Sequence, residues 1–276
     1  MGRASYNVGV LGLAAMLVAC GTPLEERPDN AAPTFVSLNP CIDAIVTQVA
    51  GPDQVLALSH YSRDPAASSM DVETALRFGV TGGTAEEVIA LQPDMVLAGS
   101  FIAPATKVAL EKAGLRVETF GSPANVDESV EQVHRIARLA QNENAGESLA
   151  AHILHHPNAP DGDQKSALLW QPGQLVAGEA SLVAEHLRWA GFSNFAQTRG
   201  LSQADHITLE QVLADQPDLL LVAGDSPGQL HPVLNGEFTQ MQIAHFDPKL
   251  FYCGGPTIPQ ARERLLEIRA NMETMP

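Results

Sequence analysis

The sequence predicts an α/β protein of two similar lobes, each built on a mostly parallel sheet, joined by one long helix. One reason is a near-repeat: TAEEVIALQPDMVLAGS at 84–100 returns as TLEQVLADQPDLLLVAG at 208–224, with eight of seventeen positions identical. The other reason is a helical hydrophobic stripe of about thirty residues between the two copies. Two copies so far apart cannot stack as a solenoid, so the repeat indicates a pair of related lobes.

Each copy of the repeat predicts a helix, a turn and a strand. Thr84 and Thr208 each open a capping box, in which the threonine hydroxyl caps the first turn and an acid or amide three residues later reaches back. Pro93 and Pro217 end the two helices, because proline cannot continue a helix. The apolar runs MVLAGS and LLLVAG that follow suit strands that are buried on both faces, as in a parallel sheet.

The rest of the chain alternates short apolar runs with helical patterns, which is typical of an α/β protein. We expect a first lobe at 34–124, a linking helix at 125–157 and a second lobe at 158–276. Outside the repeat, the expected strands are at 35–39, 54–59, 166–170 and 250–253, and the expected helices are at 41–51, 181–192 and 262–272.

Residues 1–20 read as a targeting segment. Arg3 supplies a positive start, and the apolar run VGVLGLAAMLVAC is too short to span a bilayer. The end of this run, Leu-Val-Ala-Cys20 before a glycine, resembles the lipobox of bacterial lipoproteins, which implies acylation of Cys20 and a membrane anchor. The polar, proline-rich stretch at 21–33 is then a flexible tether.

Composition narrows the classes of partner. The 276 residues carry 16 Lys and Arg against 32 Asp and Glu, and the formal net charge of −16 argues against nucleic acid. The sequence has no Gly-x-Ser-x-Gly, P-loop or His-Glu-x-x-His motif, so we expect no enzyme and no resident cofactor or metal. Besides Cys20, the cysteines are Cys41 and Cys253, which can pair in an oxidising compartment or stay free.

The order and spacing of these segments resemble those of a known family. From about Phe35 to Met272 the chain is similar to the periplasmic binding proteins of ABC importers for iron–siderophore complexes, haem and vitamin B12. The resemblance rests on FVSLNPCIDAIV, VLALSHYSRDP, the two repeat copies, the linking helix and the closing strand and helix. It implies the class III fold of that family and a monomer in the periplasm. Such a protein hands a small molecule to an importer permease and catalyses nothing.

Two segments bear on the cargo. SHYSRDP is closest to the corresponding loop of the vitamin B12 binders, which favours a corrinoid over a siderophore or haem. The cysteines in NPCIDA and FYCGGP depart from the family's general pattern, and this departure puts any ligand copied from a relative in doubt.

Ligand-binding residues are expected where strands end. In open α/β sheets the ligand crevice lies outside the carboxyl ends of the strands, and in two facing lobes those ends line the cleft. Aromatic residues make up only 5% of the chain, yet several fall at strand ends, where they suit a large planar ligand. The candidate ligand-binding residues are Asn39, Cys41, His60, Tyr61, Arg63, Ser100, Phe101, Trp170, Tyr252, Cys253 and Gly254.

Glu86 and Glu210 occupy equivalent places in the two repeats, each in the first turn of a helix. Acidic residues favour helix N-termini for electrostatic reasons alone. The family resemblance implies a further role, in which one glutamate per lobe docks onto arginines of the membrane permease.

Two alternative functions stay open for the cleft. Cys41, Cys253 and His60 have the donor atoms of a soft-metal site, which would make the chain a metal-ion binding protein. One of the two cysteines with His60 would also serve as the nucleophile and base of a cysteine-dependent enzyme.

Overall fold

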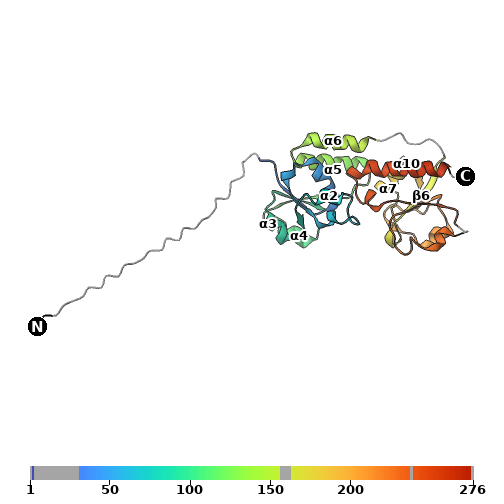
Figure 1. The fold of residues 1–276 in the computed structure, drawn as a ribbon, viewed down its shortest axis with the longest axis horizontal. Coiled ribbons are helices and arrows are strands. Elements are labelled where there is room, and N and C mark those ends of the chain that lie inside the picture. Colours follow the sequence, from blue (N-terminus) through green and yellow to red (C-terminus); the bar gives the residue numbers. More distant parts are fainter. Residues whose placement is uncertain (1, 3–30, 156–162, 237–238, 275–276) are drawn as a thin grey trace. The chain divides into compact units, whose positions relative to one another are not determined.

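The computed structural model describes residues 2, 31–155, 163–236 and 239–274 (Figure 1). The expected targeting segment, its Cys20 and most of the tether lie outside the described residues. In the part of the chain that is described, no helix has both the length and the apolar character that crossing a bilayer requires. From Ala32 onward the chain is built on two sheets, and each sheet contains one copy of the repeat.

The first sheet is parallel throughout and has the order β3-β2-β1-β4-β5. Successive residues of the central strands point to opposite faces of the sheet, and both faces are covered by helices. Phe35 packs with α1 on one face, and Val36 packs with α3 and α4 on the other. These strands are therefore apolar along their whole length. The strands are β1 (Phe35–Ser37), β2 (Val55–Ser59), β3 (Val80–Thr81), β4 (Met95–Gly99) and β5 (Arg116–Phe120). The helices are α1 (Pro40–Val49), η1 (Pro52–Gln54), η2 (His60–Arg63), α2 (Val72–Ala75), α3 (Ala85–Leu91) and α4 (Pro104–Lys112).

The second sheet has the corresponding order, β11-β10-β6-β7-β9, with β8 paired to β6. β6, β8, β10 and β11 are parallel, whereas β7 pairs antiparallel with both β6 and β9. The strands are β6 (Lys165–Trp170), β7 (Leu175–Val176), β8 (Phe192–Asn194), β9 (Asp205–His206), β10 (Leu219–Val222) and β11 (Gln242–His245). The helices are η3 (Pro172–Gln174), α7 (Leu182–Trp189), α8 (Phe195–Thr198), α9 (Leu209–Ala214), η4 (Pro232–Asn235), η5 (Pro248–Leu250), η6 (Gly255–Thr257) and α10 (Ile258–Thr274). The prediction of two α/β lobes with mostly parallel sheets is confirmed.

The aspartate of the Pro-Asp pair has the same structural role in both copies of the repeat. Asp94 Oδ2 accepts hydrogen bonds from the backbone N–H and the hydroxyl of Thr34, at 2.7 and 2.8 Å, where β1 begins. Asp218 Oδ2 accepts the same two bonds from Ser166 on β6, again at 2.7 and 2.8 Å. In each lobe the aspartate therefore fixes the repeat strand beside the first strand, and the two copies are equivalent in structure as well as in sequence.

The N-terminal caps of α3 and α9, the helices of the two repeat copies, differ from each other. Thr208 forms the expected capping box: its hydroxyl accepts the Gln211 N–H at 3.3 Å, and Gln211 Oε1 accepts the Thr208 N–H at 2.8 Å. Thr84 also accepts a bond from the Glu87 N–H at 3.3 Å. However, Glu87 Oε2 accepts its hydrogen bonds from the Gly82 N–H, at 2.7 Å, and the Thr81 hydroxyl, at 2.9 Å. The reciprocal capping box predicted for the first copy is therefore wrong, because Glu87 fastens the preceding glycine loop.

The expected strand at 250–253 is also wrong. This stretch holds the end of η5 and a turn, because the Asp247 carboxylate accepts the Lys249 N–H at 3.0 Å and so caps a short helix at Pro248. The strand at the edge of the second sheet is β11, which comes earlier in the chain.

The segment after the first lobe contains two antiparallel helices where we expected one. α5 (Val126–Leu139) and α6 (Glu143–Leu154) lie side by side (Figure 1). Gly146 on α6 packs against Ala137 on α5. The chain reverses at Gln141, which adopts a left-handed backbone conformation with φ 56°. The apolar sides of both helices belong to the core of the first lobe.

We expect Gly146→Ala to destabilise the protein, because Gly146 lies at a close contact between α5 and α6. A Cβ atom at this position would be 2.4 Å from the Cβ atom of Ala137. In an open helix the same substitution stabilises by about 1 kcal/mol. Overpacking at this contact should instead lower the free energy of unfolding by about 1–3 kcal/mol, measured by urea unfolding.

The reciprocal substitution is the control for this prediction. Adding Ala137→Gly to Gly146→Ala makes room for the new methyl group, so the double variant should lose less stability than the two single variants together, by roughly 1 kcal/mol. A Gly146→Ala protein as stable as the wild type would contradict the close packing.

Candidate functional site

A cavity of about 200 Å³ lies where the two lobes meet. Its walls in the first lobe come from the carboxyl ends of β1, β4 and β5, and its walls in the second lobe come from the start of α7 and the loop at 251–254. The strand order of the first sheet changes direction between β1 and β4, and ligand crevices form at such switch points. The predicted site residues that line this cavity are Asn39, Cys41, Ser100, Phe101, Tyr252, Cys253 and Gly254.

Asn39 orders the wall of the cavity in the first lobe. Its side-chain oxygen caps α1 by accepting the N–H groups of Cys41 and Ile42, at 2.9 and 3.2 Å. Its amide nitrogen lies over Gly99 at the end of β4, where a Cβ atom would be only 2.9 Å away. A glycine at the end of β4 therefore lets the cap and the neighbouring strand share one small space.

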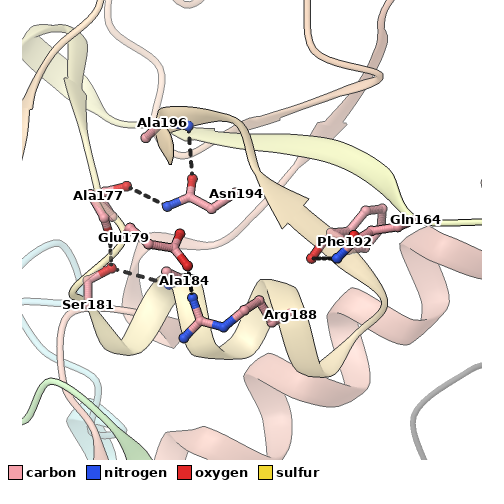
Figure 2. Close-up of polar contacts among 10 residues, drawn as sticks. Gln164, Ala177, Glu179, Ser181, Ala184, Arg188, Phe192, Asn194 and Ala196 are labelled. Atoms are coloured by element: carbon pink, nitrogen blue, oxygen red, sulfur yellow. Dashed lines mark hydrogen bonds and ion pairs between the residues drawn. The ribbon is translucent and has the colours of Figure 1, made fainter. Parts of the chain in front are cut away.

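The wall in the second lobe is the N-terminus of α7, which several polar contacts hold in place (Figure 2). Ser181 caps the helix by accepting the Ala184 N–H at 3.2 Å. Glu179, just before the cap, pairs with Arg188 on α7. Asn194 donates to a backbone carbonyl of the segment that leads into the cap, at 3.2 Å. The start of α7 is therefore a fixed surface of the cavity.

Hydrogen bonds and apolar packing join the two lobes beside the cavity. The Gly255 N–H donates to Ser129 Oγ on α5 at 2.6 Å. The Val126 N–H, at the start of α5, donates to Glu185 Oε2 on α7 at 2.9 Å. Leu182 of the second lobe belongs to the apolar core of the first.

A disulfide also joins the lobes. Cys41 in the first turn of α1 is bonded to Cys253, 212 residues later, with their Cα atoms 5.2 Å apart. Both cysteines line the cavity. The bond leaves neither thiolate free to bind a metal or to attack a substrate, which removes the basis of the two cysteine alternatives. Among the described residues, no cluster of three His, Cys, Asp or Glu side chains has the arrangement of a metal site.

Among the residues that the structure describes, none that lines the cavity has an acidic, basic or histidine side chain. Its polar groups are the amides of Asn39 and Gln132 and the hydroxyls of Ser100, Ser122, Ser181 and Tyr252, set among Ile, Leu, Val, Phe and Pro. Amides and hydroxyls can donate and accept hydrogen bonds without carrying charge. The cavity is therefore suited to a cargo that presents neutral polar groups on an apolar body.

Aromatic side chains stand at the edge of the cavity. Phe101 is 92% exposed although it is a large apolar residue, and Tyr252 is 41% exposed. Burial, assisted by the nearby carboxylates of Asp247 and Asp64, raises the pKa of Tyr252, so its hydroxyl stays protonated at neutral pH. The two rings offer apolar faces to a ligand, and the tyrosine adds a hydrogen-bonding tip.

Three predicted site residues lie on the turn η2 and are not part of the cavity lining. The turn follows β2, which lies on the side of β1 away from β4, so it misses the switch point. Arg63 Nη2 donates to the Phe78 carbonyl at 2.8 Å, which gives the guanidinium a partner within its own lobe. His60 and Tyr61 pack against each other with ring centroids 4.0 Å apart.

A buried carboxyl holds this turn in place. Asp43 on α1 is fully buried, and its Oδ2 accepts hydrogen bonds from the Ser59 N–H at 2.9 Å and the Ser62 hydroxyl at 2.6 Å. Burial raises the pKa of Asp43 to about 7, against the lowering effect of hydrogen bonds from Ser37, Ser62 and Ser59.

Trp170 is a core residue, contrary to its predicted place in the ligand site. It is 0% exposed, and its indole N–H donates to the Ile207 carbonyl at 2.8 Å. A separate hollow of about 250 Å³ lies at the carboxyl ends of β6 and β10, the switch point of the second sheet, and Gln174 and Gln229 are among its lining residues.

The sequence prediction omits two walls of the cavity. Residues 120–123 form the end of β5 and the turn after it, and the alternating pattern RVETF of β5 is a strand signal. Ser181 stands directly before an apolar helical pattern, which is the usual place of an N-cap. Gln132, on the side of α5, carries no local signal that would have identified it.

Glu86 and Glu210 are both exposed in the first turns of α3 and α9. They occupy equivalent positions, because these helices precede β4 and β10, the matching strands of the two sheets. Glu86 and Glu210 therefore place one solvent-exposed carboxylate on each lobe.

Comparison with known proteins gives a family match and several relatives. Residues 35–246 match the periplasmic binding protein family. A cobalamin-binding protein of Halobacterium salinarum is 27% identical over 234 residues, a match that covers 77% of this chain and 61% of the relative. The chain thus spans about three fifths of the length of the curated relatives that it matches.

Solved structures share the fold. The periplasmic haem-binding protein BhuT, solved with two haems, is similar with a TM-score of 0.70 at 17% identity, covering 88% of this chain and 99% of its own. The periplasmic vitamin B12-binding protein BtuF of Vibrio cholerae is similar with a TM-score of 0.63 at 17% identity, covering 88% and 99%.

We expect the buried Asp43 to make stability depend on pH. The folded carboxyl keeps its proton up to about pH 7, whereas in the unfolded chain it ionises near its ordinary pKa of 3.8. The folded state therefore binds more protons between these values, so this group lowers the free energy of unfolding as pH rises. Asp43→Asn cannot ionise and should gain stability relative to the wild type from pH 4 to pH 7, by at most about 4 kcal/mol.

Urea unfolding at intervals between pH 4 and pH 8 measures this difference. Asp218→Asn is the control of opposite sign, because hydrogen bonds from the Ser166 N–H and hydroxyl hold the pKa of Asp218 below its ordinary value. Its stabilising effect is present at neutral pH and is lost as pH falls. A stability difference between Asp43→Asn and the wild type that does not change with pH would contradict the assignment.

Proposed function

Because the chain belongs to the periplasmic binding protein family, we propose that it captures a corrinoid in the cavity between its lobes and delivers it to an ABC importer. The observation that carries this proposal is the uncharged lining of the cavity. The same site binds its cargo and releases it unchanged, so the function is transport and not catalysis.

The charge of the cargo decides between the candidates. The rim of a corrin ring carries amide side chains, which pair with amides and hydroxyls such as those of Asn39, Gln132 and Ser181. Haem carries two propionates, and many ferric chelates are anionic; both call for an arginine or a lysine as partner. Burying a carboxylate against this neutral lining would leave it without a counter-ion.

The size of the cavity defines how the cargo would sit. Pockets that enclose a drug-sized ligand span about 300–1,000 Å³, and this cavity has about 200 Å³. A corrinoid would therefore place one edge inside and rest its ring on Phe101 and Tyr252 at the mouth. The similarity to cobalamin-binding relatives supports this cargo over the haem carried by other proteins of the same fold.

We place the protein outside the cytoplasm, as its family implies, and propose that acylated Cys20 anchors it to a membrane, with residues 21–33 as the tether. The disulfide supports an oxidising compartment, since such bonds persist there and are rare in the cytosol.

Calorimetric titration of the full chain with cyanocobalamin, haemin and an anionic ferric siderophore tests the cargo. We expect cyanocobalamin to bind with micromolar or tighter affinity and the two anionic ligands to bind at least about ten-fold more weakly. Phe101→Ala and Tyr252→Ala should each weaken cyanocobalamin binding about ten-fold through lost ring contact. Leu230→Ala, which removes an exposed apolar side chain outside the cavity lining, should have no effect. Tight binding of haemin without cyanocobalamin binding would reject the corrinoid.

We further propose that Glu86 and Glu210 dock the protein onto the importer permease, one from each lobe. Cyanocobalamin uptake by cells that carry the importer should fall at least about ten-fold in the double variant Glu86→Lys with Glu210→Lys, because like charges would then meet across the interface. Glu143→Lys, in the first turn of α6, is the matched control and should leave uptake unchanged. If the double variant also loses cyanocobalamin affinity, the docking role is rejected.

A further inference from the structure

The disulfide is a covalent link between the lobes in addition to the backbone itself. The backbone passes from the first lobe to the second once, between α6 and β6. The bond between Cys41 and Cys253 is a second covalent crossing, at the N-terminus of α1. It lies in the wall of the cavity, beside the Asn39 cap on one side and Gly254 on the other.

We propose that the Cys41–Cys253 disulfide is a covalent clasp that fixes the width of the cargo cavity and holds the seam between the lobes closed. Hydrogen bonds and apolar packing across the seam can open and re-form, whereas a covalent bond keeps the two walls at one separation. The clasp therefore resists sliding of one lobe against the other, which the non-covalent contacts alone would permit.

The surroundings of the disulfide show which contacts the clasp protects. The interlobe hydrogen bonds from the Gly255 N–H to Ser129, at 2.6 Å, and from the Val126 N–H to Glu185, at 2.9 Å, belong to the same seam. Gly254 leaves no room for displacement: a Cβ atom there would lie 2.7 Å from Ser129 Oγ and 2.9 Å from the ring of Pro123. A sideways shift of the lobes would break both hydrogen bonds and this packing together.

The clasp has a direct effect on the cavity. Cys41 is fixed to Asn39 through the cap of α1, and Cys253 is flanked by Tyr252 and Gly254, so the bond sets the distance between the walls that the two lobes contribute. The cargo then meets a preformed site, and little binding energy is spent on ordering the lobes.

Hydrogen exchange without ligand tests the clasp. The reference is the full chain with Cys20→Ser, and the test variant adds Cys41→Ser and Cys253→Ser, so that no other thiol is present. We expect the Val126 and Gly255 amides, which bond across the seam, to exchange at least about ten-fold faster in the test variant. The Ser100 and Ala223 amides bond within one lobe, to Phe120 and Trp170, and should change less than about two-fold.

Two results would overturn the clasp. Equal acceleration of all four amides would mean that the disulfide acts on global stability alone. Unchanged exchange at Val126 and Gly255 would mean that the seam holds without it.

A second measurement, the dissociation of cyanocobalamin, rests on the proposed function. Failure of the proposed function can be distinguished from failure of the clasp. Cyanocobalamin should dissociate about ten-fold faster from the test variant than from the reference. If neither protein binds cyanocobalamin while the two seam amides still accelerate, the clasp stands and the corrinoid cargo fails. If both bind equally well, the clasp does not set the width of the site.

Discussion

The position of α1 is the constraint on which the rest of the structure depends. The apolar face of this helix, including Val46, packs in a core to which Ile258 of the second lobe also belongs. Asp43, one turn before Val46, is also buried, and its carboxyl holds the turn after β2. Its N-terminus carries the Asn39 cap and Cys41. A shift of this one helix would disturb the core, the buried carboxyl, the cavity wall and the interlobe bond at once, because all four share a single backbone.

Much of the fold follows from the sequence, since the repeat encodes a physical unit. Its aspartate fastens the same strand pair in both lobes, so the pattern and the structure recur together. The turn between α5 and α6 does not follow, because no proline or glycine marks it and Gln141 adopts the left-handed conformation instead. The polar run at 141–144 interrupts the hydrophobic stripe, but the stripe resumes at Leu149 and Ile153, since both helices face the same core. Periodicity alone therefore cannot separate two antiparallel helices from one long helix.

The site was predictable where topology decides it and not where packing decides it. Asn39 and Ser100 follow β1 and β4, and the strand-end rule finds both, because the switch point lies between those strands. His60 also follows a strand but lies one strand away from the switch point. Trp170 sits at the end of β6, where its indole finds a buried carbonyl partner and the ring fills the core. Strand ends identify candidates, the sheet order chooses among them, and packing excludes those whose side chains fill the core.

The span of the disulfide has a consequence for how the protein is made. Cys41 leaves the ribosome and any export channel well before Cys253, which lies 212 residues further along the chain. All contacts within the first lobe can form while the later cysteine is still absent. Pairing must therefore wait until the strands of the second lobe, which all precede Cys253, have been synthesised. A premature partner for Cys41 would have to be exchanged for the native one, so maturation calls for a compartment in which thiols and disulfides interchange.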